Sequence, residues 1–205
     1  MIAIIDYGVG NIFSLKSSLD KISAEAVLTG SRETIEKCDR IILPGVGAFG
    51  DAIVLLKKNG LNGIIKEECK KGKPLLGICL GMQLLFEKSF EYGEHEGLGL
   101  IKGGVVPMEG AIPKELKIPH IGWNSLLFPK NREKSRLFKY ISEGSYVYFV
   151  HSYFGTNCKE SVSALTEYGA ELTAAVEREN VFGVQFHPEK SGDVGLNILK
   201  GFCEL

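Results

Sequence analysis

The amino-acid sequence predicts a single α/β domain that covers residues 1–205. We expect an open, mostly parallel twisted sheet flanked by helices, with antiparallel additions in the second half of the chain. Two observations predict this fold class. The first half alternates short, continuously apolar strand-like runs with helical patterns, which is typical of parallel sheets covered on both faces. The second half is rich in strand-like runs separated by turns, and no linker, low-complexity tract or internal repeat marks a second domain.

The first strand is expected at residues 2–5, an apolar run that ends at Asp6. A helix should follow, because apolar residues recur at helical spacing from Ile12 to Ile22. The other strands of this half are expected at residues 26–28, 40–43 and 75–78.

Helices connect these strands and become rare in the second half. Two helical segments with a break near Gly60 follow the third strand, Gly72 is well placed to end the second segment, and another helix should pass through residues 84–86. A last helix is expected at residues 194–202. The strand-like runs of the second half lie at residues 97–101, 146–150, 162–165, 173–176 and 181–186.

Composition limits the classes of function. Lys and Arg number 24 against 25 Asp and Glu, so a formal charge of −1 gives the chain as a whole no attraction to nucleic acid or to an anionic membrane. No apolar stretch approaches the roughly 20 residues of a membrane span, and the N-terminus lacks the basic region of a secretory signal. The 5 cysteines are scattered without a C-x-x-C pair, so neither a zinc site nor a disulfide framework is expected. We therefore expect a reduced, cytoplasmic protein without a metal or a cofactor.

Cys79 is the candidate nucleophile. It stands in Gly77-Ile78-Cys79-Leu80-Gly81, where a predicted strand becomes a predicted helix, at the spacing of the G-x-S-x-G nucleophile elbow. Such a turn holds its central residue in a strained backbone conformation and leaves no room for a Cβ at either glycine. It presents the sulfur at the carboxyl edge of the sheet, beside a helix N-terminus that favours the thiolate. The alternative is a buried core cysteine, which would not need flanking glycines.

His187 is the candidate base, because imidazole can accept and return a proton near neutral pH. It follows the strand expected at residues 181–186 and precedes Pro188 and Glu189. Proline restricts this tripeptide to extended geometry, in which His187 and Glu189 point the same way, so that the carboxylate can fix the imidazole tautomer and stabilise the imidazolium. Without Cys79, the two residues would be an incidental surface pair.

The other three histidines have different expected roles. His95 lies among acidic and glycine residues and is expected to be solvated. His120 and His151 follow or end apolar strands, so we expect them to be structural or to line the substrate pocket rather than to be catalytic.

A thiol nucleophile also needs donors for the charge that develops on the carbonyl oxygen, and backbone N–H groups usually supply them. One donor should be the N–H of Leu80, directly after the nucleophile. The glycine-rich segment 44–47 (Pro-Gly-Val-Gly) follows a predicted strand, so the amides of Val46 and Gly47 can turn toward the site. The alternative is a simple strand-ending turn.

Residues 6–11 suggest a dinucleotide site, because they follow a strand and open a helix. The G-x-G-x-x-G pattern would need a glycine at position 13, which is Phe13, and no acidic residue stands at a strand end at the required distance. Asn11 is more simply the N-cap of the helix that follows.

The chain resembles the triad-type glutamine amidotransferases over nearly all of its length. The resemblance is carried by Gly77-Ile78-Cys79-Leu80-Gly81-Met82-Gln83 and Gly183-Val184-Gln185-Phe186-His187-Pro188-Glu189. Four further motifs are similar to those of the glutaminase subunits of imidazole glycerol phosphate synthases: Asp6-Tyr7-Gly8-Val9-Gly10-Asn11, Pro44-Gly45-Val46-Gly47-Ala48-Phe49-Gly50-Asp51, His120-Ile121-Gly122-Trp123-Asn124 and Tyr148-Phe149-Val150-His151-Ser152-Tyr153. The resemblance implies hydrolysis of glutamine to glutamate and ammonia, which passes to a (β/α)₈ cyclase subunit that forms imidazole glycerol phosphate in histidine biosynthesis.

The resemblance also implies roles for individual residues. Cys79, His187 and Glu189 would be the nucleophile, the base and the orienting carboxylate. The residues implied to line the glutamine pocket are Gly47, Gln83, His151, Ser152 and Tyr153. The residues implied to contact the cyclase are Asn11, Trp123, Tyr148 and Lys190, although Trp123 could equally be core and Lys190 a solvated charge. The isolated chain should have very low glutaminase activity.

Three other functions are also compatible with the sequence. The first is an ammonia donor of the same fold that serves another acceptor, such as a surface-sugar amidating enzyme or a pyridoxal phosphate synthase. The second is a stand-alone cysteine hydrolase with no ammonia channel, which would be active alone. The third is a binding scaffold with a silent site, which the intact triad disfavours.

Overall fold

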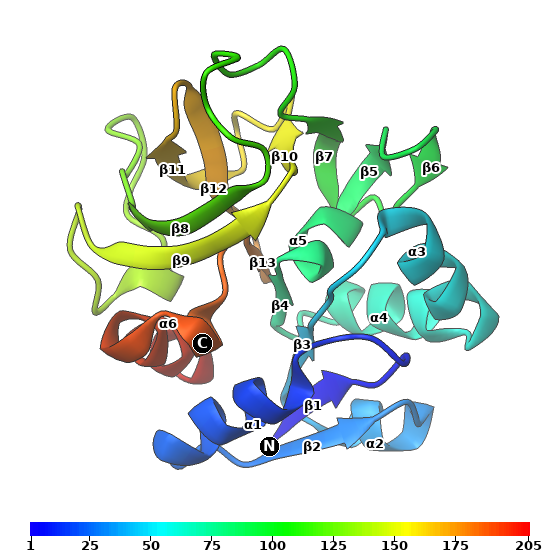
Figure 1. Ribbon diagram of the computed structural model, residues 1–205. Helices are drawn as coiled ribbons and strands as arrows, with labels where there is room; N and C mark the ends of the chain where they lie inside the picture. Colours follow the sequence, from blue (N-terminus) through cyan, green and yellow to red (C-terminus); the bar gives the residue numbers. More distant parts are fainter.

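The structure is a computed structural model that describes residues 1–205, and its centre is a seven-stranded sheet (Figure 1). The strands lie in the order β11-β12-β13-β4-β3-β1-β2. Five neighbouring strands are parallel: β13 (Val181–Val184), β4 (Leu75–Ile78), β3 (Arg40–Leu43), β1 (Ile2–Ile5) and β2 (Ala26–Thr29). The two strands that extend this sheet at one edge, β12 (Glu171–Arg178) and β11 (Val162–Glu167), are antiparallel. The predicted fold class, an open and mostly parallel sheet with later antiparallel additions, is confirmed.

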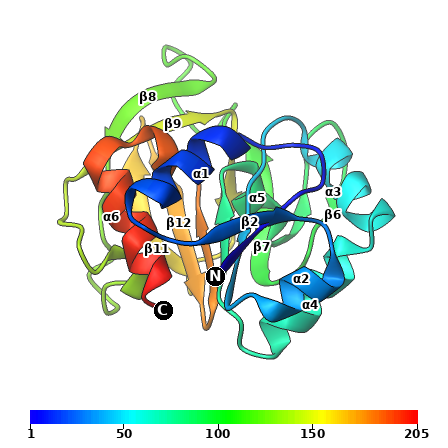
Figure 2. The same ribbon diagram turned by 90° about the horizontal axis from the view of Figure 1, so that it is seen from below.

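Helices cover both faces of this sheet, because the strands are apolar on both sides (Figure 2). Ile2 and Ile4 of β1 point into one core cluster with α1 (Ile12–Lys21) and α6 (Gly192–Cys203). Ala3 and Ile5 point into the other cluster, with the helices α2 (Arg32–Lys37), α3 (Phe49–Lys58) and α4 (Leu61–Lys70). Each large aliphatic side chain buried in this way contributes about 1.5–3 kcal/mol to the stability of the fold. The helices on both faces therefore keep the sheet fixed.

Two smaller sheets that the sequence did not predict as such complete the fold. One contains β10 (Tyr153–Thr156), β7 (Ile101–Pro107), β5 (Phe86–Ser89) and β6 (His95–Glu96), in that order, and the other pairs β8 (His120–Ser125) with β9 (Tyr146–His151). Two short 3₁₀ helices are η1 (Arg136–Phe138) and η2 (Pro188–Lys190).

Two predicted elements near α5 (Leu80–Leu84) were wrong in their limits. The helix expected to continue through Phe86 ends at Leu84, because Phe86 is buried and pairs with Ile101 in the second sheet. The strand expected at residues 97–101 begins only at Ile101. Residues 97–100 form a loop instead. This loop packs closely against α5 and β5, and Gly97 lies too close to the carbonyl of Phe86 to carry a side chain.

The parallel strands bring four loops to one edge of the sheet. Loops leave the carboxyl ends of the neighbouring strands β13, β4, β3 and β1, and ligands of open α/β sheets bind at this edge. The register places Gly77 of β4 opposite Gly183 of β13, so the segments that follow the two strands start level with each other. Cys79 and His187 lie on these segments.

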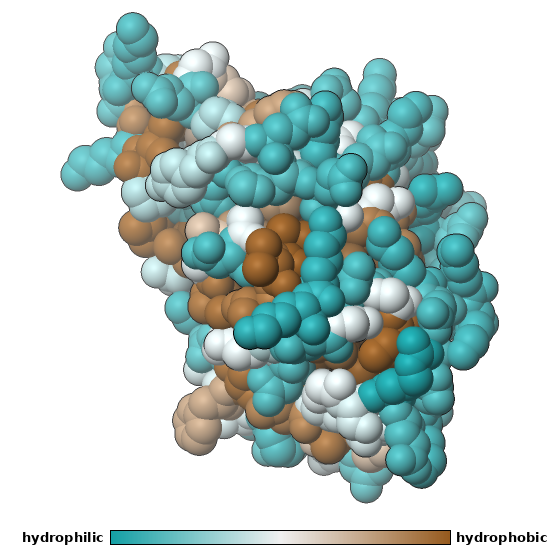
Figure 3. All heavy atoms as spheres, turned by 90° about the vertical axis from the view of Figure 1, so that its right-hand side faces the viewer, coloured by the Kyte–Doolittle hydropathy of each residue, from teal (hydrophilic) through white to brown (hydrophobic).

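The face that carries α3 and α4 is mainly hydrophilic, with small apolar areas between polar side chains (Figure 3). No helix has both the length and the apolar character that a membrane crossing requires. All five cysteines are free thiols.

Candidate active site

Cys79 occupies the sharp turn between β4 and α5, with φ 53° and ψ −110°. This is a strained backbone conformation for a residue with a side chain. The turn is possible because of its two glycines. A Cβ on Gly77 would lie 2.6 Å from the carbonyl oxygen of Gly81, and a Cβ on Gly81 would overlap the carbonyl oxygen of Leu43. The elbow predicted from the sequence is therefore present, with α5 packed directly against the end of β3.

His187 lines the same pocket as Cys79, and its Nδ1 is 2.8 Å from Oε1 of Glu189. His187 and Glu189 are each only 3% exposed in their side chains. Burial opposes the charged imidazolium, but the hydrogen bonds to Cys79 and Glu189 outweigh it and raise the pKa of His187 to about 9. The structure thus places Cys79, His187 and Glu189, the residues that the sequence predicted as nucleophile, base and orienting carboxylate, in one region.

The path of the chain at this point differs from the predicted one. His187 has extended backbone angles, but residues 188–190 form η2, with the N–H of Lys190 donating to the carbonyl of His187 at 3.0 Å. The prediction of an extended tripeptide was therefore wrong for Glu189. Pro188 presets the φ angle of a first helical turn, so it begins a 3₁₀ turn that brings Glu189 back under the imidazole.

Gln185, which the sequence did not single out, donates from Nε2 to Sγ of Cys79 at 3.7 Å. Its Oε1 accepts from Nε2 of Gln83 at 3.0 Å, and the same Gln83 nitrogen lies 3.3 Å from the carbonyl of Tyr153. Both amides are buried. Gln83 was expected to line the substrate pocket; it does so, and it also holds the donor that reaches the sulfur. The sequence offered one signal for Gln185, because a glutamine is unusual in the apolar strand that precedes His187.

The segment after β3 lies next to the elbow. The hydroxyl of the buried Tyr7 donates to the carbonyl of Pro44 at 2.8 Å, and Gly47 has φ 96°. Val46, Gly47 and Leu80, the three residues expected to form the oxyanion hole, line one pocket with Cys79. Tyr7, from the loop after β1, anchors the start of this segment.

This pocket has a volume of about 470 Å³ and contains both Cys79 and His187. All five residues expected to line the glutamine site belong to it: Gly47, Gln83, His151, Ser152 and Tyr153. Glu91, which the sequence did not single out, contributes the only carboxylate of the lining, and its Oε2 accepts from the N–H of Phe49 at 2.5 Å. One glutamate among several in a polar loop gives no sequence signal.

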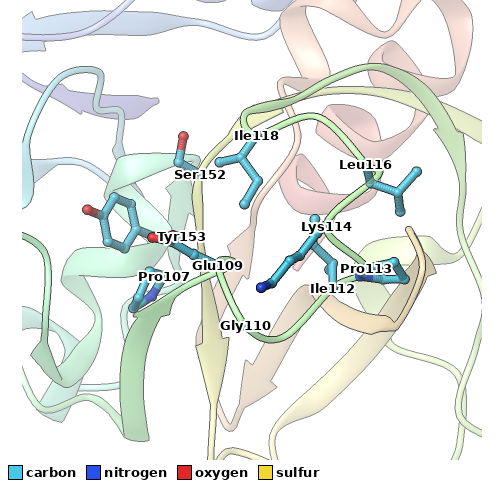
Figure 4. Close-up of a pocket in the computed structure, with 10 residues that line it drawn as sticks. All are labelled: Pro107, Glu109, Gly110, Ile112, Pro113, Lys114, Leu116, Ile118, Ser152 and Tyr153. Carbon is cyan, nitrogen blue, oxygen red and sulfur yellow. The ribbon is translucent and has the colours of Figure 1, made fainter.

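A larger hollow of about 650 Å³ lies on the other side of Ser152 and Tyr153. Figure 4 shows the residues that line it, which come from the segment between Pro107 and Ile118 and from Ser152 and Tyr153. It contains no cysteine or histidine. The smaller pocket, which holds the reactive pair, is therefore the candidate active site.

His120 and His151 form a buried neutral pair, and His151 lines the pocket. Nδ1 of His151 lies 2.8 Å from the carbonyl of Tyr153, so it must carry the proton there, and Nε2 accepts from Nδ1 of His120 at 3.1 Å. Nε2 of His120 faces the amide of Asn124 at 3.4 Å. Burial lowers the pKa of His151 to about 4 and also lowers that of His120. Their expected role, structural or lining the pocket, agrees with this geometry, whereas His95 packs half-buried against Phe49 instead of being fully solvated.

Of the four residues expected to contact a partner, Lys190 lines the pocket. Trp123 is 54% exposed and meets Tyr148 edge-on at 6.2 Å between ring centroids. The ammonium of Lys190 lies 5.7 Å from the centre of the Tyr148 ring, so these three residues form one continuous patch. Asn11 makes no N-cap bond; instead, its amide donates to Glu189 at 3.3 Å.

Comparisons with known proteins point to one family. The family model "Glutamine amidotransferase class-I" matches residues 3–204. The chain is 52% identical to an "Imidazole glycerol phosphate synthase subunit HisH" of Caldanaerobacter subterraneus, with 100% of this chain and 98% of that protein covered. It is 48% identical to the protein of the same name from Wolinella succinogenes, with 100% of both chains covered. Among solved structures, "Structure of PurLQS from Thermotoga maritima" has a TM-score of 0.76 at 18% identity, covers 99% of this chain and 97% of that chain, and shows the shared fold.

Proposed function

The chain belongs to the class-I glutamine amidotransferase family, and we propose that it is the glutaminase subunit of an imidazole glycerol phosphate synthase. In this role it hydrolyses L-glutamine to glutamate and ammonia, and the ammonia passes to a (β/α)₈ cyclase subunit of histidine biosynthesis. The observation that carries the proposal is that Cys79 and His187 line one pocket, with Glu189 hydrogen-bonded to the imidazole of His187. The names of the full-length relatives support the choice of acceptor over another ammonia-using enzyme.

The geometry supports a two-step covalent mechanism. His187 first takes the thiol proton of Cys79, the thiolate attacks the carboxamide carbon of glutamine, and the imidazolium of His187 delivers the proton to the departing ammonia, leaving a γ-glutamyl thioester. His187 then accepts a proton from water, the hydroxide attacks the thioester, and glutamate leaves as the thiol is restored. The N–H groups of Leu80 and of Val46 or Gly47 would stabilise the oxyanion in both steps. Glu189 keeps the imidazole oriented throughout.

Glu91 is expected to bind the α-ammonium group of glutamine, because it is the only carboxylate in the pocket lining. Replacing Glu91 with glutamine removes the charge, so KM for glutamine should rise by about 10- to 100-fold, since a hydrogen bond to a charged group contributes about 1.5–3 kcal/mol. Initial rates of glutamate release over a range of glutamine concentrations measure this. Glu94→Gln, an exposed neighbour in the same loop, is the matched control and should leave KM unchanged. An unchanged KM in Glu91→Gln would remove this assignment.

The activity should fall at alkaline pH, with a midpoint near 9. The pKa of His187 is raised above its ordinary value, so the imidazolium that gives a proton to ammonia is present at neutral pH and is lost as the pH rises through about 9. The pH profile of kcat/KM between pH 6 and pH 10 tests this. Glu189→Gln removes one cause of the raised pKa and should move the midpoint to lower pH. A wild-type profile that stays flat to pH 10 contradicts the assignment.

A partner subunit follows from the chemistry of the product. Ammonia is mostly protonated at neutral pH, and the ammonium ion is not a nucleophile, so it must reach its acceptor through a path that excludes water. The patch formed by Trp123, Tyr148 and Lys190 lies beside the pocket mouth and offers aromatic and cationic groups for docking. We propose that this patch and Asn11 face the mouth of the cyclase barrel.

The decisive test is glutamate release by the purified chain with and without the cyclase subunit. We expect very low release from the chain alone and an increase of at least about tenfold when the cyclase and its nucleotide substrate are added. Full turnover without any partner would favour a stand-alone cysteine hydrolase. Equal activation by unrelated acceptor subunits would remove the histidine-pathway assignment.

A further inference from the structure

Glu189 is a buried carboxylate with very few donors. Oε1 accepts from His187 at 2.8 Å and from Nδ2 of Asn11 at 3.3 Å, whereas Oε2 is buried and has no hydrogen-bond partner. No lysine or arginine forms an ion pair with it; the neighbouring Lys190 lies instead over the ring of Tyr148. A buried carboxylate depends strongly on each of its donors. Asn11 is the only side chain apart from His187 that supplies one.

Asn11 contacts Glu189 in place of a local interaction. It stands at the N-cap position of α1, where a side-chain oxygen usually accepts from the first turn and stabilises the helix by about 1 kcal/mol. No such bond is present, and the amide reaches a residue 178 positions away in the sequence. A local preference left unsatisfied in favour of a distant contact is a feature of functional sites.

The surroundings of Glu189 do not fix it by packing alone. A cavity of about 10 Å³ adjoins the carboxylate, lined by Asn11, Leu15, Pro44, Gly45, Val46, Ile78, His187 and Glu189. The cavity leaves a small void beside the side chain, and the hydrogen bonds to His187 and Asn11 are the polar contacts that hold the carboxylate. Val46 lines the same cavity, so a displaced carboxylate would reach the segment expected to form the oxyanion hole.

We propose that Asn11 is a positioning residue for the reaction: its amide holds Glu189 in the orientation that directs the imidazole of His187 at Cys79. This inference rests on the proposed function, because it concerns the same three residues. It gives Asn11 a role inside the subunit that is separate from any contact with a partner. Loss of the amide should lower kcat while leaving KM for glutamine nearly unchanged, because Asn11 does not line the glutamine pocket.

Three substitutions separate positioning from a merely structural role. In the complex saturated with cyclase, Asn11→Ala should lower kcat by about tenfold or more. Asn11→Gln keeps the amide donor and should recover part of that loss. Asn11→Asp exchanges the donor for a carboxylate, and the only titratable groups around it in the cavity are Glu189 and His187. Its kcat relative to wild type should therefore rise as the pH is lowered from 8 to 6, since the introduced carboxyl group can donate again once it is protonated. The same ratio for Asn11→Ala should stay constant.

Asn59→Asp, the same change at an exposed position after α3, is the matched control and should behave as wild type. A second measurement does not depend on turnover: the proton on Nδ1 of His187, shared with Glu189, should give a far-downfield ¹H NMR resonance in the full-length chain. This resonance should shift upfield or broaden in Asn11→Ala and be retained in Asn59→Asp.

The outcomes distinguish the proposed function from the positioning role of Asn11. A wild-type complex that releases no glutamate would overturn the proposed function, while the His187 resonance would still decide the role of Asn11. An Asn11→Ala variant with kcat within about twofold of wild type and an unchanged resonance would overturn the positioning role. Weaker docking of Asn11→Ala to the cyclase, with normal kcat at saturation, would also overturn it and leave Asn11 as a contact residue only.

Discussion

A Cys79→Gly variant is expected to lose glutamine hydrolysis by about 10⁴-fold or more and to be more stable than Cys79→Ala. The activity is lost because the nucleophile is missing in both variants. The stability differs because Cys79 has φ 53°, which glycine adopts freely and alanine does not. Strained backbone of this kind costs about 1–3 kcal/mol, so we expect the glycine variant to unfold at a higher urea concentration.

The comparison with Cys79→Ala is the control, since both substitutions remove the thiol and differ only in the Cβ. Urea denaturation followed by circular dichroism gives the two free energies of unfolding, and glutamate release gives the activities. Equal stabilities would show that the elbow is not strained. Residual hydrolysis in either variant would show that another group attacks the substrate.

The second large effect is expected from Gly81→Ala, which should destabilise the protein by about 3 kcal/mol or more and abolish activity. A Cβ at this position would overlap the carbonyl oxygen of Leu43, at the end of the central strand β3. This oxygen belongs to the backbone and not to a flexible side chain, so it cannot move aside. The N-terminus of α5 would have to separate from β3, and Cys79 would move with it.

Gly63→Ala in α4 is the matched control, because an added Cβ there meets no atom within 4 Å. It should stabilise the protein by about 0.5–1 kcal/mol, since alanine favours helices over glycine. Thermal unfolding of the two variants beside the wild type measures both effects. A Gly81→Ala protein with wild-type stability and activity would mean that the contact between α5 and β3 is not as close as described.

The sequence predicted those parts of the fold that depend on local pattern. The apolar strands at residues 2–5, 40–43 and 75–78 form the centre of the sheet, because continuous runs of this kind are stable only when buried on both faces. Cys79 and His187 were predictable because each follows such a strand, and parallel strands bring their carboxyl ends together.

Other parts depend on contacts between distant segments and had no local signal. The strand β5 begins directly after α5, since Phe86 finds a buried partner strand that no periodicity in its own segment announces. Glu91 and Gln185 act through neighbours far away in the sequence, Phe49 and Cys79 respectively.

The pairing of Gly77 with Gly183 has a consequence for how catalytic distances are set. Two residues beyond each glycine stand Cys79 and Gln185, whose side chains meet, and two residues further stands His187. The ladder between β4 and β13 thus brings the segments of Cys79 and His187 to the same level of the sheet edge. The outlying strand β9 fixes the second segment as well, because the N–H of His187 donates to the carbonyl of Tyr148 at 2.9 Å, so a change in β9 would move the imidazole although the central sheet stays intact.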